Sequence, residues 1–377
     1  MHERLGRLPA ADPPLQAAAR ERFWDLLGDR ADELAALRRD VNAGGDLAAC
    51  WERYRESRRR SVTLARELLA FVEGAYSRHA GLDLGLLRIA EALLTDLSRR
   101  LELGWDPLVV LAEAEFYGEE AQIIRLRFPD VSVWNLTVAA HEFGHFAGPR
   151  LSAKESDGRS WDLDSPFREL LRRERERGPR EWARMHELMA DLFAVYTMGP
   201  AYVCSCLLLR FDPGATDVDG PTHPSAPKRA ALLLWALERM EQEGDEVSGV
   251  LQAVRARWTA GVAGATGRDP AAVEAARRRV AQPLEATFEE LWEALRQTTA
   301  RRRRYDRLAV AQRLKTGLAA KAWDATVEDD VALVDVLNAA WLSRIDHWDD
   351  DRDLVPTIGG RSLALCNAIV DRGPPDR

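Results

Sequence analysis

Apolar residues along the first hundred positions recur every three or four residues, which is the spacing of one face of an α-helix. The pattern predicts an N-terminal helical module over residues 1–103. A glycine-containing break at residues 42–45 separates its first two helices, and Gly104 follows the third. The helices of this module are expected over residues 16–40, 47–77 and 84–103.

After residue 104 the pattern changes to an alternation of apolar and polar positions. Residues 108–117 and 121–128 each alternate in this way, and Gly118 with two glutamates lies between them. Because a period of two is typical of a half-buried strand, we expect an antiparallel hairpin here, the only strands of the chain.

Helical spacing returns in residues 131–146, with Asp130 or Ser132 as the expected N-cap. Proline and glycine delimit a further helix over residues 180–198. The pattern therefore predicts a mainly α (α+β) fold with modules at 1–103, 104–262 and 263–377. Further helices are expected over residues 166–177, 226–243, 245–262, 270–300, 306–321, 328–345 and 360–371.

Composition narrows the class of protein without indicating a function. The 377 residues are 46% hydrophobic and 30% charged, which is typical of a globular protein. A net charge of -8 argues against a dedicated nucleic-acid binder, so we interpret the arginine runs at 58–60 and 301–304 as solvated helix faces.

The N-terminus has no apolar signal segment, and no window approaches the roughly 20 apolar residues of a membrane span. Four scattered cysteines do not form a disulfide framework, and we expect a cytoplasmic, reduced protein. The pair Cys204 and Cys206 lacks a second cysteine pair, so burial is favoured over metal binding.

The strongest candidate chemistry is the H-E-x-x-H motif formed by residues 141–145. On a helix, His141 and His145 lie one turn apart and point the same way, so both imidazoles can bind one Zn²⁺ ion. Two neutral histidines and one carboxylate would leave net positive charge on zinc, which lowers the pKa of a bound water toward ~7. Glu142 is then the expected general base, which later passes the proton to the leaving amine.

A catalytic zinc usually takes three protein ligands. The metzincin arrangement would require a histidine where this chain has Leu151. Glu187 is the better third ligand, and Asp191, four residues later on the same helix face, can accept a hydrogen bond from His141. His186 competes with Glu187 but lies about 100° round the helix from it. Small residues on both helices would let their backbones approach: Ala139, Ala140, Gly144, Ala183, Ala190 and Ala194.

Together these motifs resemble the gluzincin class of zinc metallopeptidases. The chain is most similar to the group whose second ligand helix reads E-x-x-A-D, which includes the CAAX-processing protease and HtpX-type enzymes. Residues 187–191 match this pattern at each fixed position, and His223-Pro224 followed by Arg229 resembles the H-P-x-x-x-x-R segment of that group. The resemblance covers roughly residues 108–245.

The resemblance implies a zincin-like metallopeptidase core and a peptide or protein substrate bound by strand addition to residues 108–117 or 121–128. It also implies that His223 donates a hydrogen bond to the tetrahedral oxyanion, with Tyr196 and Tyr202 as weaker candidates. A loop histidine with no catalytic role is the alternative interpretation of His223. The ImmA/IrrE type of bacterial regulatory protease is a second, soluble resemblance.

The resemblance has limits. Its closest group is commonly membrane-embedded, so membrane-protein substrates do not carry over to this chain, and the flanking modules resemble no family.

We expect a zinc-dependent metallopeptidase. The alternatives are a non-catalytic zinc-binding scaffold or regulatory interaction protein, and a helical interaction protein in which the motif is accidental. Neither substrate specificity nor oligomeric state follows from the sequence.

Overall fold

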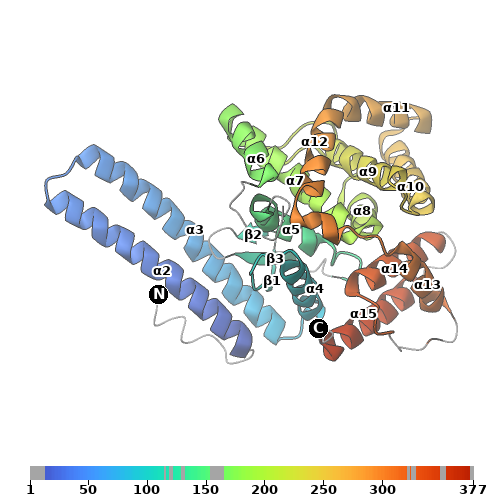
Figure 1. The fold of residues 1–377 in the computed structure, drawn as a ribbon, viewed down its shortest axis with the longest axis horizontal. Helices are drawn as coiled ribbons and strands as arrows, with labels where there is room; N and C mark the ends of the chain where they lie inside the picture. Colours follow the sequence, from blue (N-terminus) through green and yellow to red (C-terminus); the bar gives the residue numbers. More distant parts are fainter. Residues whose placement is uncertain are drawn as a thin grey trace, which may run out of the picture. The chain divides into compact units, whose positions relative to one another are not determined.

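The computed structural model describes residues 13–113, 116–118, 122–128, 132–152, 165–320, 323, 328–348 and 354–373. These residues are mainly helical, with one small mixed sheet (Figure 1). The chain forms two compact units: Met1–Leu87 with Asp106–Asp130, and Arg88–Trp105 with Val131–Arg377. The mainly α expectation is confirmed, while the boundaries 1–103, 104–262 and 263–377 stay a prediction.

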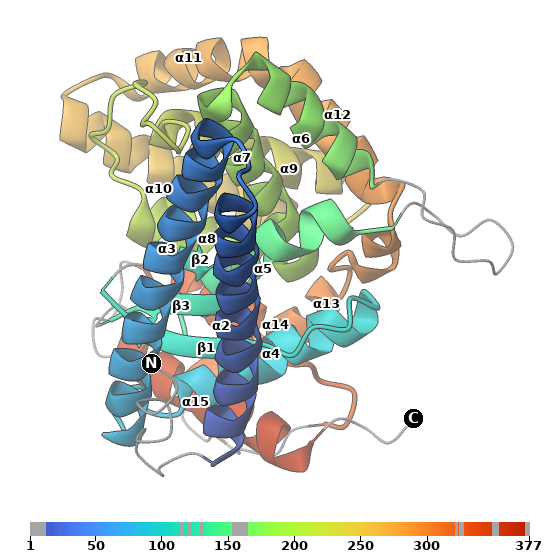
Figure 2. The same ribbon diagram turned by 90° about the vertical axis from the view of Figure 1, so that its left-hand side faces the viewer.

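The first unit contains a long helical hairpin of α2 (Pro13–Asn42) and α3 (Leu47–His79), which lie side by side in Figure 2. Asp46 caps α3 by accepting a hydrogen bond of 2.9 Å from the backbone N–H of Ala48. Phe23 on α2 packs against Phe71 on α3, and both are buried. The two predicted helices are therefore confirmed, and both are longer than the sequence pattern indicated.

The same unit holds a three-stranded sheet of β1 (Leu108–Ala112), β2 (Phe116–Gly118) and β3 (Ile123–Arg127), in the order β1-β3-β2. β2 pairs antiparallel to β3, but β1 pairs parallel to β3. The predicted two-stranded hairpin is therefore wrong for residues 108–112. Since β3 is the central strand, Ile123–Arg127 cannot be the edge for strand addition that was expected over residues 121–128.

The physical reason lies in β1 itself. Leu108 to Leu111 are all buried, which is typical of a parallel strand covered on both faces rather than of an exposed hairpin strand. α3 approaches closely because it carries Gly74 here: a Cβ at this position would lie 2.5 Å from the carbonyl oxygen of Leu111. The run 108–117 therefore divides into two strands that pair with opposite edges of β3.

The described residues of the second unit form helices joined by loops, and α7 (Pro179–Met198) lies at its centre. α7 packs against α5 (Val138–Ala147), α6 (Pro166–Arg177) and α9 (Ala226–Gln242) (Figure 1). Its other elements are α4 (Leu86–Arg100, which begins in the first unit), η1 (Gly148–Arg150), α8 (Pro200–Ser205), η2 (Cys206–Arg210), α10 (Ser248–Thr266), α11 (Pro270–Ala281), η3 (Gln282–Leu284), α12 (Glu285–Arg296), η4 (Thr299–Arg303), α13 (Leu308–Ala319), α14 (Leu333–Asp346) and α15 (Leu354–Arg372).

Several predicted helix boundaries in this unit are wrong, among them those of the helices expected over residues 131–146, 270–300 and 360–371. The helix expected over residues 270–300 is interrupted at η3, because Pro283 removes a backbone donor. The motif helix α5 begins at Val138 with Thr137 as its N-cap, so Ser132 is not the cap. Instead, residues 132–137 form turns. In the first of these, the Asn135 N–H donates a hydrogen bond to the Ser132 carbonyl. Asp130, the other expected cap, lies outside the described residues.

No helix among the described residues is long and apolar enough to cross a membrane. All four cysteines are buried and free: Cys50, Cys204, Cys206 and Cys366. This agrees with the expectation that Cys204 and Cys206 have a packing role.

Candidate metal centre

Helices α5 and α7 approach closely at Gly144 and Ala190. A Cβ at Gly144 would lie 3.1 Å from the Cα of Ala190 and 3.2 Å from the ring of Phe193. Ala190 is fully buried, as are Ala139, Ala140 and Ala194, whereas Ala183 is partly exposed. The close approach expected from the small residues is therefore present at the middle of both helices.

Aromatic packing sets the rotation of α5 about its axis. Phe143 and Phe146 both stack on Trp105, and the Phe143 ring also contacts Phe193 edge-on. Phe143 and Phe193 are fully buried. Since residues one or two positions apart point to different sides of a helix, His141 and His145 lie on a different side of α5 from Phe143.

The three predicted ligands converge. Nε2 of His141 lies 3.4 Å from Oε2 of Glu187, and Nε2 of His145 lies 3.5 Å from Oε1 of the same carboxylate. One potential ligand atom from each residue lies within 4.8 Å of the other two. The group thus offers two imidazole nitrogens and one carboxylate oxygen, the donor set of a catalytic zinc site with one position left for water.

Unsatisfied polar atoms test whether a cation fits this group. Among the described residues, Oε2 of Glu187 and Nδ1 of His145 are buried and have no hydrogen-bond partner. The 3.4 Å and 3.5 Å separations also exceed those of well-formed hydrogen bonds. Because a buried carboxylate oxygen without a partner is unfavourable, a cation between the three side chains would complete the site.

Asp191 contacts His141 on the side opposite the ligand group. Its Oδ1 lies 3.0 Å from Nδ1 of His141 and accepts a 2.6 Å hydrogen bond from the Tyr202 hydroxyl. Arg229 donates two more hydrogen bonds to Asp191, from Nε and Nη2, each 2.7 Å long. Asp191 is fully buried, so this network supplies its charge with partners in place of water. The predicted contact between Asp191 and His141 is present.

The protonation states follow from these contacts. Burial alone would lower the pKa of His141, but Asp191 and Glu187 outweigh it and raise the pKa to about 9. Burial and the neighbouring charge of His141 hold the pKa of His145 well below its ordinary value. Burial would raise the pKa of Glu187, yet His141, His145 and Arg229 lower it to about 2. The carboxylate is therefore ionised at neutral pH, as a metal ligand must be.

Glu142 and His186 are the remaining candidate residues of the two motifs, and they differ in their contacts. Glu142 is buried on α5, next to His141. Nε2 of His186 lies 3.1 Å from the backbone carbonyl oxygen of His145, so this nitrogen is engaged and His186 does not belong to the ligand group. Glu187, and not His186, therefore belongs to the group of three potential ligands.

His223 lies at the same centre although it is 36 residues beyond Glu187 in the sequence. Its Nε2 is 3.2 Å from Oε1 of Glu187, and its side chain is 57% exposed. Thr222 contacts Nδ1 of His223 through its hydroxyl at 2.7 Å. The loop is further held by Asp219, which accepts hydrogen bonds from the ammonium group of Lys228 and the backbone N–H of Ser225. The exposed imidazole therefore stands at the open side of the group.

The two tyrosines differ in their placement. The ring of Tyr196 packs edge-on against Trp292. Tyr202 reaches the centre, but its hydroxyl bonds to Asp191 and contacts the outer nitrogen of His141, so the expected oxyanion role does not fit it. Sequence reasoning missed this contact and also the pairing of Arg229 with Asp191. The only signal in the sequence for the pairing of Arg229 with Asp191 was the position of Arg229 in the downstream H-P-x-x-x-x-R pattern.

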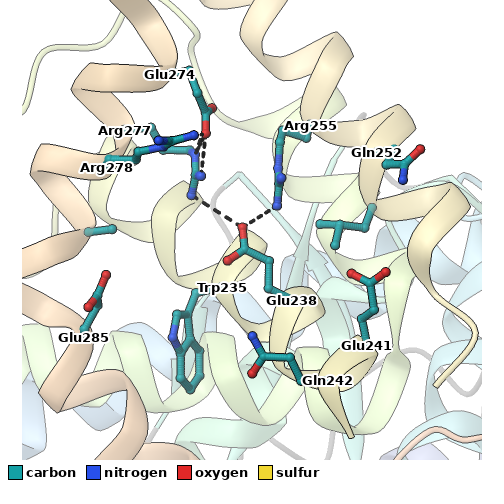
Figure 3. Close-up of a pocket in the computed structure, with 12 residues that line it drawn as sticks. Trp235, Glu238, Glu241, Gln242, Gln252, Arg255, Glu274, Arg277, Arg278 and Glu285 are labelled. Atoms are coloured by element: carbon teal, nitrogen blue, oxygen red, sulfur yellow. Dashed lines mark hydrogen bonds and ion pairs between the residues drawn. The ribbon is translucent and has the colours of Figure 1, made fainter. Parts of the chain in front are cut away.

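A separate pocket of about 520 Å³ lies among α9, α10, α11 and the start of α12 (Figure 3). Its central Glu238 pairs with Arg255 and Arg277, and Arg277 also bonds to Glu274 at 2.6 Å. The pocket contains none of the predicted site residues, and its central charges neutralise one another. We therefore place the candidate chemistry at the α5–α7 contact.

Comparisons of the chain with protein-family models, with curated proteins and with solved structures find no match.

Proposed function

We propose that this protein is a zinc-dependent metallopeptidase with a zincin-like core. The observation that carries the proposal is the convergence of His141, His145 and Glu187 around a buried carboxylate oxygen that has no hydrogen-bond partner among the described residues. Glu142, the residue expected to move a proton, lies on the same helix turn as the two histidines. These residues are the ligand set and the general base expected from the two sequence motifs.

Each residue then has one task. Zinc, when bound, would supply a water of lowered pKa and polarise the scissile carbonyl. Glu142 accepts a proton from the attacking water at its carboxylate and donates it to the leaving amine. Asp191 holds the proton on Nδ1 of His141, so that Nε2 is free to bind the metal.

His223 is proposed as the oxyanion donor. The hydroxyl of Thr222 can donate to Nδ1 of His223, which leaves the proton on Nε2, the nitrogen nearest Glu187. From this exposed position Nε2–H can donate to the carbonyl oxygen as negative charge develops on it. Its exposure is also what access by a peptide would require.

The proposal is tested by Glu142→Gln, assayed against a broad peptide library with zinc content measured in the same samples. We expect the variant to keep one zinc per chain and to lose at least about 100-fold in hydrolysis, since general acid–base catalysis contributes this much or more. Glu285→Gln, a glutamate on α12 away from the ligand group, is the matched control and should cleave normally. An unchanged rate in Glu142→Gln would refute the proposal, while zinc binding without any wild-type cleavage would favour the non-catalytic scaffold.

A further inference from the structure

Tyr202 is held in place by a break between two helices. α7 ends at Met198, and Gly199 takes a positive φ of 65° before α8 begins at Pro200. Asn338 secures this break from α14: its amide nitrogen donates to the Met198 carbonyl at 2.8 Å, and its amide oxygen accepts from the Ala201 N–H at 2.9 Å. The turn folds the first residues of α8 back toward α5.

The Tyr202 hydroxyl consequently lies between Asp191 and His141. It donates to Oδ1 of Asp191 at 2.6 Å, and its oxygen is 3.0 Å from Nδ1 of His141. The Tyr202 and His141 rings are nearly parallel, with an interplanar angle of 13°. Tyr202 is 1% exposed, so its hydroxyl is shielded from solvent.

This geometry determines which nitrogen of His141 keeps its proton when the ring is neutral. Ionised Asp191 can only accept hydrogen bonds, so its 3.0 Å contact requires a proton on Nδ1. Because the hydroxyl proton of Tyr202 is already donated to Asp191, its oxygen acts as a second acceptor for that Nδ1–H. Both neighbours therefore favour the tautomer in which Nε2 presents its lone pair to the ligand group.

We propose that Tyr202 is a positioning residue that fixes the tautomer and ring orientation of His141 for zinc. The inference rests on the proposed metal centre and adds a partner outside the two recognised motifs. Arg229 orients the opposite side of Asp191, so the carboxylate is held between a guanidinium and a phenol. Removing an outer partner of a zinc-bound histidine typically lowers metal affinity 10–100-fold.

The test is Tyr202→Phe, which keeps the ring and deletes the hydroxyl. Zinc affinity is measured by competition with a chelator of known affinity, and the cobalt(II)-substituted protein is examined by visible absorption. We expect about a tenfold or greater loss of zinc affinity and an altered cobalt spectrum. Tyr305→Phe is the control, because Tyr305 is also buried but its hydroxyl bonds to the Arg307 carbonyl.

If the Tyr202 hydroxyl has a purely structural role, Tyr202→Phe should behave like Tyr305→Phe. Both variants would then be easier to unfold, and the cobalt spectrum of each would be unchanged. Tyr202→Phe with wild-type zinc affinity and cobalt spectrum would overturn the inference even if the wild-type protein cleaves peptides. Failure of the wild-type protein to bind zinc would instead overturn the proposed function. The two failures are distinguished because the wild-type protein binds zinc in the first and does not bind it in the second.

Discussion

Nδ1 of His141 lies 3.0 Å from Oδ1 of Asp191, across the contact between α5 and α7. This contact links the two motifs directly, because His141 belongs to the H-E-x-x-H helix and Asp191 to the E-x-x-A-D helix. A histidine that binds a metal through Nε2 needs its other nitrogen held by an acceptor. The contact therefore leads to predictions for metal affinity, stability and pH dependence.

The identity of the third ligand can be tested by two neighbouring substitutions. Glu187→Ala should weaken zinc binding by more than about 100-fold, since it removes a direct ligand and even outer-layer changes weaken binding 10–100-fold. His186→Ala should keep stoichiometric zinc, because its Nε2 is engaged by the backbone of His145. Metal analysis after gel filtration checks both. Zinc lost from His186→Ala but kept by Glu187→Ala would reverse the assignment.

Asp191 and Arg229 should show strong energetic coupling. Asp191→Ala leaves the largely buried guanidinium of Arg229 without its carboxylate, which we expect to lower the free energy of unfolding by about 3–5 kcal/mol. The double variant Asp191→Leu/Arg229→Met should be less destabilised than Asp191→Ala, because no buried charge is left unpaired. Denaturant unfolding of metal-stripped protein measures both. Equal or greater loss in the double variant would contradict the coupling.

Zinc affinity should rise with pH across the neutral range. The pKa of His141 is raised to about 9, so in metal-stripped protein this ring is protonated at neutral pH and must release its proton to bind zinc. Affinity should increase about tenfold per pH unit below pH 9, and calorimetry in buffers of different ionisation enthalpy should detect the released proton. An affinity that is constant between about pH 6 and 8 would argue against this.

The same raised pKa has the opposite consequence for the metal-stripped fold. When a histidine has a higher pKa in the folded state than in the unfolded state, it stabilises the folded state. This stabilisation is fully present when the pH is below the unfolded pKa. For His141 this stabilisation should be present below pH about 6.5 and lost as pH rises toward about 9. Denaturant unfolding at several pH values measures the trend, and added zinc should reverse it.

Gly144→Ala should disturb the contact between α5 and α7. The added methyl would meet the backbone of Ala190 at 3.1 Å, and backbone atoms cannot rotate away as a side chain does. We expect a loss of about 1–3 kcal/mol in stability together with weaker zinc binding. Gly264→Ala on α10 is the control, since no atom lies within 4 Å of its added Cβ. It should be neutral or stabilising by up to about 1 kcal/mol. Thermal unfolding and zinc titration of both variants decide the point.

The sequence by itself determined the local features of this protein. The periodicity identified the helical hairpin and most helices, and the i, i+4 spacing placed His141 beside His145 and Glu187 beside Asp191, because the helix repeat is a property of the covalent chain. Glycine and alanine at the facing positions indicated that α5 and α7 would pack closely, and Gly144 shows why.

Only the tertiary structure decided how distant segments meet. β1 pairs parallel to β3, and α3 approaches β1 closely at Gly74, and the local alternation of residues 108–117 reveals neither contact. Tyr202 reaches His141 through the break at Gly199, where Asn338, 137 residues beyond Ala201, holds the chain. Periodicity reports which face of an element is apolar, but contacts between polar side chains depend on loop conformation and on packing partners far away in the sequence.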